Sequence, residues 1–158
     1  MKSVVKIFIV YGGREGEGYA QIINDYFKKK NIGSFLASRQ SPDMHAGSDV
    51  PSRIDENLLK SEIAIIIITP ELRDSDEAMS EIHQIQHQLM IPYIPYRRRE
   101  SNIPPILLDK QFVEFDPAEL NTNELQQLEL EMWRSLDFAR ISIASTQETQ
   151  NVEVSYIG

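Results

Sequence analysis

The chain has 158 residues, enough for one domain with a single sizeable core. Hydrophobic residues make up 41% of it and charged residues 25%, which is ordinary for a globular domain. Its formal net charge of -8 argues against non-specific binding to nucleic acid or anionic membranes, because both select basic surfaces. It contains no cysteine, so disulfides, thiolate metal sites and cysteine nucleophiles are excluded.

The first predicted strand is Val4–Val10, a run of mostly β-branched and aromatic residues. This apolar stretch is brief and lacks the cleavage site of a signal peptide, and no apolar segment is long enough to span a bilayer. We therefore expect a cytoplasmic protein without membrane contact. A glycine-rich loop is expected over Tyr11–Gly18, followed by an amphipathic helix that ends at Lys28–Lys30 and a short strand, Ser34–Ala37.

The clearest signal for a buried strand is Ile63–Ile68, an unbroken apolar run dominated by isoleucine. Such a run is typical of a central parallel strand that is buried on both faces. It is preceded by a long polar loop, Ser38–Pro51, and by a helix, Pro51–Lys60, whose first turn accommodates the proline. A polar loop, Glu71–Ser75, follows the strand and leads into a helix that carries Glu81.

The C-terminal part contains two more predicted strands and a last helix. Ile91–Tyr96 predicts a fourth strand, and its two prolines favour a short strand or one at the sheet edge. Gln111–Phe115 predicts the fifth strand. The last helix is expected to begin at a cap, Asn121 or Thr122, and to end near Ala139.

Residues 1–140 are therefore predicted to form the domain, with 141–158 as a polar C-terminal tail. The tail is expected to be a loose end or, because Val152–Ile157 alternates, an additional strand. Strands that alternate with helices predict an α/β fold with a doubly wound parallel sheet and right-handed crossovers. Ligands bind such sheets outside the carboxyl ends of the strands, which makes Glu81 the first acidic residue to consider. From position alone, a solvated helix residue is the alternative.

Five segments, in this order and with these spacings, resemble the characteristic boxes of one family. The first is an aliphatic strand that ends in an aromatic residue, and the second is a loop with an aspartate and a glycine. The third leads from that glycine to a serine before the central strand, the fourth joins a serine to the helix glutamate, and the fifth contains tryptophan. The segments are Lys6–Tyr11, Asp43–Gly47, Gly47–Ser61, Ser75–Glu81 and Met132–Leu136. Together they resemble the Toll/interleukin-1 receptor (TIR) domain over about residues 4–139.

The resemblance implies a flavodoxin-like fold, with a five-stranded parallel sheet of order 2-1-3-4-5 and helices on both faces. Many members cleave NAD+ at the nicotinamide–ribose bond with a helix glutamate, which implies a catalytic role for Glu81. NAD+ would then be a substrate, without a prosthetic group or metal, and the products would be nicotinamide and ADP-ribose or a cyclic ADP-ribose signal. Similarity to stand-alone bacterial and archaeal antiphage-defence TIR proteins further implies self-association through Ser38–Pro51 and an activating or downstream effector protein.

Substrate contacts are expected around the carboxyl edge of the sheet. The glycine-rich loop could present N–H groups to a pyrophosphate, and Arg14 could pair with a phosphate. A flexible turn and a solvated arginine are the alternatives. The family often has a tryptophan where this chain has Glu77, so Tyr11, Phe35 or Tyr93 is the expected stacking substitute. The expected NAD+-binding residues are Tyr11, Gly12, Gly13, Arg14, Phe35, Gly47, Ser48, Ser75 and Glu77.

A single glutamate suffices for the implied chemistry. Cleavage passes through an oxocarbenium-like ribose, which one nearby carboxylate can stabilise. Nicotinamide leaves without needing a proton. Two other functions remain open: a non-catalytic TIR adaptor, which Glu77 supports, and a nucleoside deoxyribosyltransferase-like enzyme with a similar sheet and helix glutamate.

Two further groups of residues have less specific interpretations. Arg97–Arg99 follows the fourth predicted strand and is interpreted as a solvated or partner-facing patch rather than a phosphate site. His83 and His87 are four residues apart on a helix but lack a third ligand and an HExxH pattern, so they are interpreted as surface residues.

Overall fold

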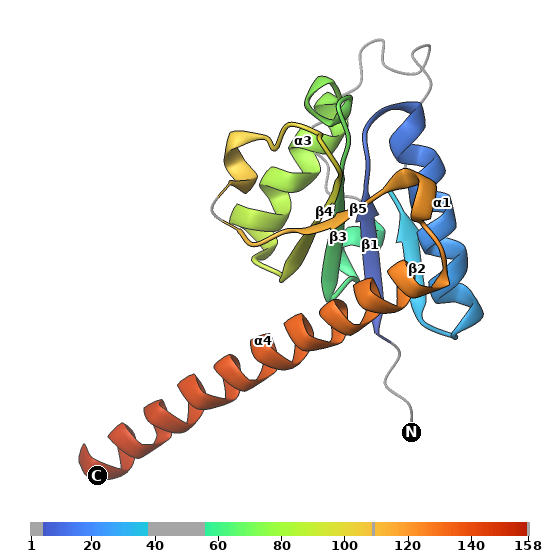
Figure 1. Ribbon diagram of the computed structural model, residues 1–158. Helices are drawn as coiled ribbons and strands as arrows, with labels where there is room; N and C mark the ends of the chain where they lie inside the picture. Colours follow the sequence, from blue (N-terminus) through green and yellow to red (C-terminus); the bar gives the residue numbers. More distant parts are fainter. Residues whose placement is uncertain (1–4, 38–55, 109, 158) are drawn as a thin grey trace.

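The computed structural model describes residues 5–37, 56–108 and 110–157, without the side chains of Glu119 and residues 141–157. Its centre is a sheet of five strands in the order β2-β1-β3-β4-β5 (Figure 1), and every neighbouring pair is parallel. This order confirms the predicted flavodoxin-like sheet. The strands are β1 Lys6–Val10, β2 Gly33–Leu36, β3 Ile63–Ile68, β4 Tyr93–Arg98 and β5 Val113–Phe115.

β3 is the central strand, as its composition predicts. All six of its residues are 0% exposed. Ile65 pairs with Ile9 of β1 on one side and with Ile94 of β4 on the other. Because a fully buried isoleucine contributes roughly 1.5–3 kcal/mol relative to an exposed one, this strand is a major part of the core.

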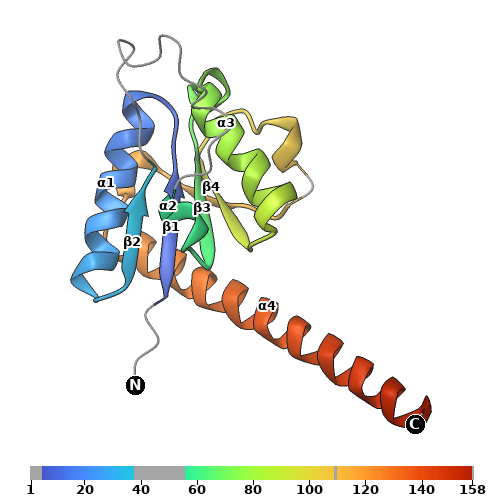
Figure 2. The ribbon, with the colours of Figure 1, turned by 180° about the vertical axis from the view of Figure 1, so that it is seen from behind.

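The helices cover both faces of the sheet, with α1 and α3 on opposite sides (Figures 1 and 2). α3 continues directly into a π-helix, η4, and short 3-10 turns occupy three of the connections. The helices are α1 Gly13–Lys29, α2 Glu56–Leu59, α3 Asp76–His83, η4 Gln84–Leu89 and α4 Thr122–Ile157, and the 3-10 turns are η3 Leu72–Asp74, η5 Pro105–Leu107 and η6 Pro117–Glu119.

The Glu129 carboxylate connects the C-terminal end of α1 to α4. Glu129 accepts hydrogen bonds from the Tyr26 hydroxyl at 2.7 Å, from Lys30 Nζ at 2.8 Å and from Trp133 Nε1 at 3.0 Å. Burial of this carboxylate opposes its ionisation, but the bonds from Lys30, Trp133 and Tyr26 outweigh burial and lower the pKa of Glu129. The contact joins two helices that are about a hundred residues apart in the chain.

β4 corrects the prediction of a short or edge strand. It has six residues and lies between β3 and β5. The Ala64 amide donates to the Pro92 carbonyl, so alternate residues from Pro92 face β3 and Pro95 faces the other side. Within β4, only Tyr96, Arg97 and Arg98 pair with β5. The missing N–H of Pro95 therefore removes no hydrogen bond from the ladder between β4 and β5.

Two other predictions of local structure were wrong. The glycine-rich stretch is not a loop throughout, because α1 begins at Gly13. A Cβ on Gly16 would lie 3.3 Å from the Tyr11 Cβ, so this glycine allows close packing of helix on strand. The stretch after Ser142, expected to be a loose end or a strand, is instead the continuation of α4 to Ile157.

Candidate functional site

The loops that follow β1 and β3, neighbouring strands in the middle of the sheet, touch each other. The Thr69 hydroxyl donates to the Gly12 carbonyl oxygen at 3.4 Å. A Cβ on Gly12 would lie 2.9 Å from the Ser75 Cβ and 3.0 Å from the Leu72 Cα. From here α1 and α3 leave toward opposite faces of the sheet (Figure 1). This is the topological switch point, where open α/β sheets bind their ligands.

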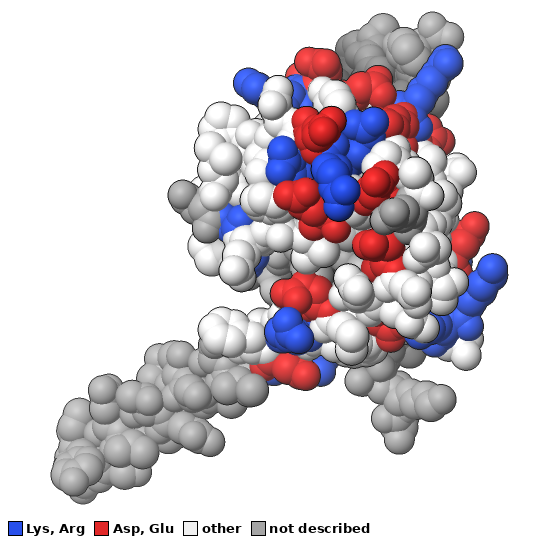
Figure 3. Space-filling view, viewed as in Figure 1, with Lys and Arg blue, Asp and Glu red and all other residues white. Residues whose placement is uncertain are grey.

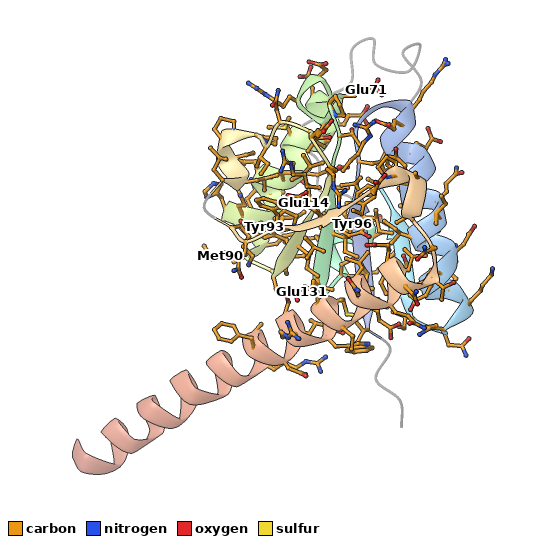
Figure 4. All side chains as sticks on the ribbon, viewed as in Figure 1. Glu71, Met90, Tyr93, Tyr96, Glu114 and Glu131 are labelled. Carbon is orange, nitrogen blue, oxygen red and sulfur yellow. The ribbon has the colours of Figure 1, made fainter. Side chains whose placement is uncertain are left out.

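The beginning of α1 lies against a carboxylate that the sequence-based prediction missed. Gly13, the first residue of α1, has a φ of 80°. A Cβ there would lie 2.5 Å from Cδ and 2.7 Å from Oε1 of Glu71, which is labelled in Figure 4. Gly12 supplies no side-chain cap, and a negative charge is favourable at a helix N-terminus. Glu71 therefore lies where α1 would receive a phosphate. Its position two residues after Thr69, at the carboxyl end of β3, was the available signal.

The predicted catalytic residue lies on the second of these helices. Ser75 is the N-cap of α3, and its Oγ accepts a hydrogen bond from the Ala78 amide at 3.2 Å. Glu77 and Glu81 are four residues apart, which places them on the same side of α3. Glu81 is only 8% exposed, Glu77 is half-buried, and both side chains have interaction partners. The helix thus presents one buried and one accessible carboxylate along a single side.

The three aromatic candidates for stacking have different surroundings. Tyr11 is buried, and its hydroxyl donates to the Ala37 carbonyl at 3.0 Å. Phe35 is half-buried in the edge strand β2, one residue from its carboxyl end. Tyr93 is the first residue of β4, at the amino edge of the sheet and well away from Glu71 in Figure 4. Phe35 is therefore the only one of these three that is both partly accessible and near the carboxyl edge.

Other predicted site residues are distributed as follows. Arg14 is exposed in the first turn of α1. Gly47, Ser48 and the rest of the Ser38–Pro51 loop lie outside the described residues. The structure thus brings Gly12, Gly13 and Ser75 together at the switch point.

The basic run is paired with carboxylates of the same chain. Its first two residues belong to β4, and only Arg99 lies beyond the strand. Basic and acidic side chains accordingly alternate on this face of the molecule in Figure 3. This pairing leaves little net positive charge for a phosphate and agrees with the interpretation as a surface patch. The pairs are Arg98 with Glu15 at 2.9 Å, Arg97 with Glu114 at 3.2 Å and Arg99 with Asp116 at 3.7 Å.

His83 and His87 are exposed, with ring centroids 4.8 Å apart. Within the described part of the chain, no group of three or more His, Cys, Asp or Glu side chains could hold a metal ion. No helix in that part is both long enough and apolar enough to cross a membrane.

Fold and site together define a doubly wound α/β domain with a carboxylate-bearing helix at its switch point. Residues 7–130 match the family model of the TIR domain, and the chain belongs to this family.

Two solved structures are similar to this chain to different degrees. The TIR domain of the Toll-related receptor TRR-2 from the lower metazoan Hydra magnipapillata superposes with a TM-score of 0.59 at 15% identity, over 79% of this chain and 95% of that one. The TIR domains of the activated Roq1 resistosome, which directly recognises the pathogen effector XopQ, give a TM-score of 0.45 at 16% identity, over 68% of this chain and 64% of that one. The search of curated proteins found no significant match.

Proposed function

We propose that this TIR domain is a cytoplasmic NAD+ nucleosidase, with Glu81 as its catalytic residue. The burial of Glu81, which is 8% exposed on the helix that starts at the switch point, is the observation that carries the proposal. Burying a carboxylate costs free energy, so a buried glutamate at the ligand-binding edge of the sheet is a candidate functional residue.

The proposed reaction breaks the bond between C1′ of the ribose and N1 of nicotinamide. The electron pair of that bond leaves with nicotinamide, which becomes neutral, and the ribose becomes an oxocarbenium-like cation. The Glu81 carboxylate stabilises this cation and orients the ribose hydroxyls. Water then adds to C1′ and loses a proton to give ADP-ribose, or a nucleophilic atom of the same molecule adds to C1′ to give a cyclic product.

The remaining contacts to NAD+ are proposed for the residues that the sequence analysis predicts. The N–H groups at the start of α1 receive the pyrophosphate, with Arg14 as its counter-charge. Glu71 turns away from Gly13 when the pyrophosphate binds. Phe35 stacks on a ring of the substrate, and Ser75 and Glu77 contact the ribose side. Gly47 and Ser48 complete the proposed site.

Regulation follows from the toxicity of uncontrolled NAD+ loss. We propose that the enzyme acts in immune defence and becomes active on self-association through the Ser38–Pro51 loop. An activating or downstream effector protein completes the pathway.

A non-catalytic adaptor is the second candidate, because Glu77 replaces an aromatic residue that would stack on the substrate. One set of incubations separates the candidates. Purified protein is incubated with NAD+, and separately with a deoxynucleoside and a free base, and the products are resolved by chromatography. Nicotinamide release supports the proposal. Base exchange without NAD+ cleavage supports a deoxyribosyltransferase, and no turnover in any assembled state supports the adaptor.

A further inference from the structure

α4 is much longer than the domain that it covers. Its 36 residues span about 54 Å at 1.5 Å per residue. Arg140 still contacts the domain, with Nη2 at 2.9 Å from the Glu62 carboxylate. Beyond Arg140 the helix runs away from the sheet in both ribbon views (Figures 1 and 2). Because most of the stability of a helix in a protein comes from tertiary packing, the segment 141–157 is expected to pack against a partner.

A groove lies beside the same helix, between α4 and the strands β4 and β5. Its volume is about 450 Å³. In Figure 3 the molecule is notched between the body of the domain and α4, and in Figure 4 Tyr93 and Glu131 lie on opposite sides of this space. The groove is open at the surface and is distinct from the switch point. Its main lining residues are Tyr93, Lys110, Phe112, Glu131, Arg134 and Phe138.

The groove combines exposed aromatic surface with basic side chains. Phe138 is 73% exposed and Phe112 is 39% exposed. Lys110 lies over the Tyr93 ring, with Nζ 4.8 Å from its centroid. Arg134 is exposed and pairs at 3.2 Å with Glu131, three residues earlier in α4. Exposed apolar surface that is bordered by charged side chains is typical of a site that binds another protein segment.

The sequence of the projecting segment complements this groove. Between residues 141 and 157 there are two acidic residues, Glu148 and Glu153, and no lysine or arginine. The remainder is uncharged and contains apolar residues at both ends: Ile141, Ile143, Val152, Val154, Tyr156 and Ile157. The segment therefore carries negative charge that can face the basic side chains of the groove and apolar side chains that can cover its exposed aromatic surface.

We infer that two copies of this chain pair through α4, and that residues 141–157 of each copy lie in the groove of the other. The two α4 helices run antiparallel about a two-fold axis, so each copy gives and receives the same contact. Phe138 and Phe112 pack on the apolar residues of the incoming segment. Arg134 and Lys110 face Glu148 and Glu153 of the second copy. This inference does not depend on NAD+ cleavage or on the Ser38–Pro51 loop.

Sedimentation velocity on the full chain tests the pairing. We expect a dimer whose dissociation constant is below about 100 µM. Phe138→Glu should raise the dissociation constant at least about tenfold, because it places a charge in the apolar contact. The matched control is Leu59→Glu, since Leu59 is 56% exposed on α2 and should leave the constant within about twofold. A monomeric wild type at that concentration, or an unchanged constant in Phe138→Glu, would overturn the inference.

Cross-linking identifies the contact directly, because the chain has no cysteine of its own. One preparation carries Ser135→Cys and another carries Thr149→Cys, and the mixture is treated with a short bismaleimide. Each copy carries a single cysteine, so the linker can join the two positions only between copies. A covalent heterodimer is expected, and Lys28→Cys in place of Ser135→Cys should give none. Equal yields from both pairs would contradict the proposed docking.

Discussion

A Cβ atom on Gly12 would lie 2.9 Å from the Cβ of Ser75, so the loops after β1 and β3 fit together because residue 12 has no side chain. Gly12 has extended backbone angles, φ -134° and ψ 135°, which alanine can also adopt. The obstacle to alanine at this position is therefore the steric clash with Ser75 and not the backbone conformation. Gly12→Ala should cost about 1–3 kcal/mol of unfolding free energy and displace the start of α3. Urea unfolding and an NAD+ cleavage assay measure the two effects.

Gly18→Ala is the control for that substitution. A Cβ on Gly18 has nothing within 4 Å, and the residue is exposed inside α1. Alanine should therefore stabilise the protein by about 0.5–1 kcal/mol, because it restricts the unfolded chain and favours the helix. Equal destabilisation by both variants would refute the assignment of the Gly12 effect to the contact with Ser75.

Glu71 should compete with a phosphate for the beginning of α1. Its Cδ would lie 2.5 Å from a Cβ on Gly13, at the end of the helix that attracts negative charge. Glu71→Gln should lower the KM for NAD+ by about two- to fivefold and leave kcat nearly unchanged, with a smaller effect at high salt. Steady-state kinetics at two ionic strengths test this, and a raised KM would show that Glu71 assists binding.

The fold was predictable where local pattern and burial agree. Ile63–Ile68 was predicted with the bounds that the structure has, because a run of apolar β-branched residues has one stable location in an α/β sheet. β4 was misjudged because proline is costly in a ladder only where its N–H would be used, and that depends on the short length of β5.

The candidate site was less predictable, since it depends on contacts between distant loops. Gly12 and Ser75 could each be proposed from the sequence, but their proximity could not. Glu71 was missed because nothing local indicates that its carboxyl group lies against Gly13. The length of α4 was missed because residues after Ser142 have little helical periodicity, and propensity alone sets a weak expectation there.

The Glu129 contact should make stability depend on pH. Its pKa is lowered in the folded state, so its contribution is present above the unfolded value, about 4.3, and is lost as pH falls through the folded pKa. Near neutral pH, Glu129→Gln should cost about 1 kcal/mol, because it weakens charge-assisted bonds to Lys30 and the two aromatic side chains. Urea unfolding from neutral pH to about pH 3 should show this difference closing. A difference that stays constant would argue against the carboxylate as its source.

Tyr96 should tolerate loss of its hydroxyl. The side chain is 0% exposed and stacks on Phe115 at 4.4 Å, and its oxygen has no hydrogen-bond partner among the described residues. Burial, followed by the charge of Glu124, raises the pKa of Tyr96, so the phenol stays neutral. Tyr96→Phe should leave stability unchanged or raise it by about 1 kcal/mol, whereas Tyr26→Phe should lower it by a similar amount. Thermal unfolding of both variants provides the comparison.

The role of Glu81 is tested most directly by nicotinamide release from NAD+ by the wild type and by Glu81→Gln at matched concentration and assembly state. Glutamine preserves the volume of the buried side chain and removes its charge, so the variant should fold. We predict cleavage by the wild type and a rate lower by at least about a hundredfold in Glu81→Gln. Equal rates in the two proteins, or no cleavage by the assembled wild type, would contradict the proposal.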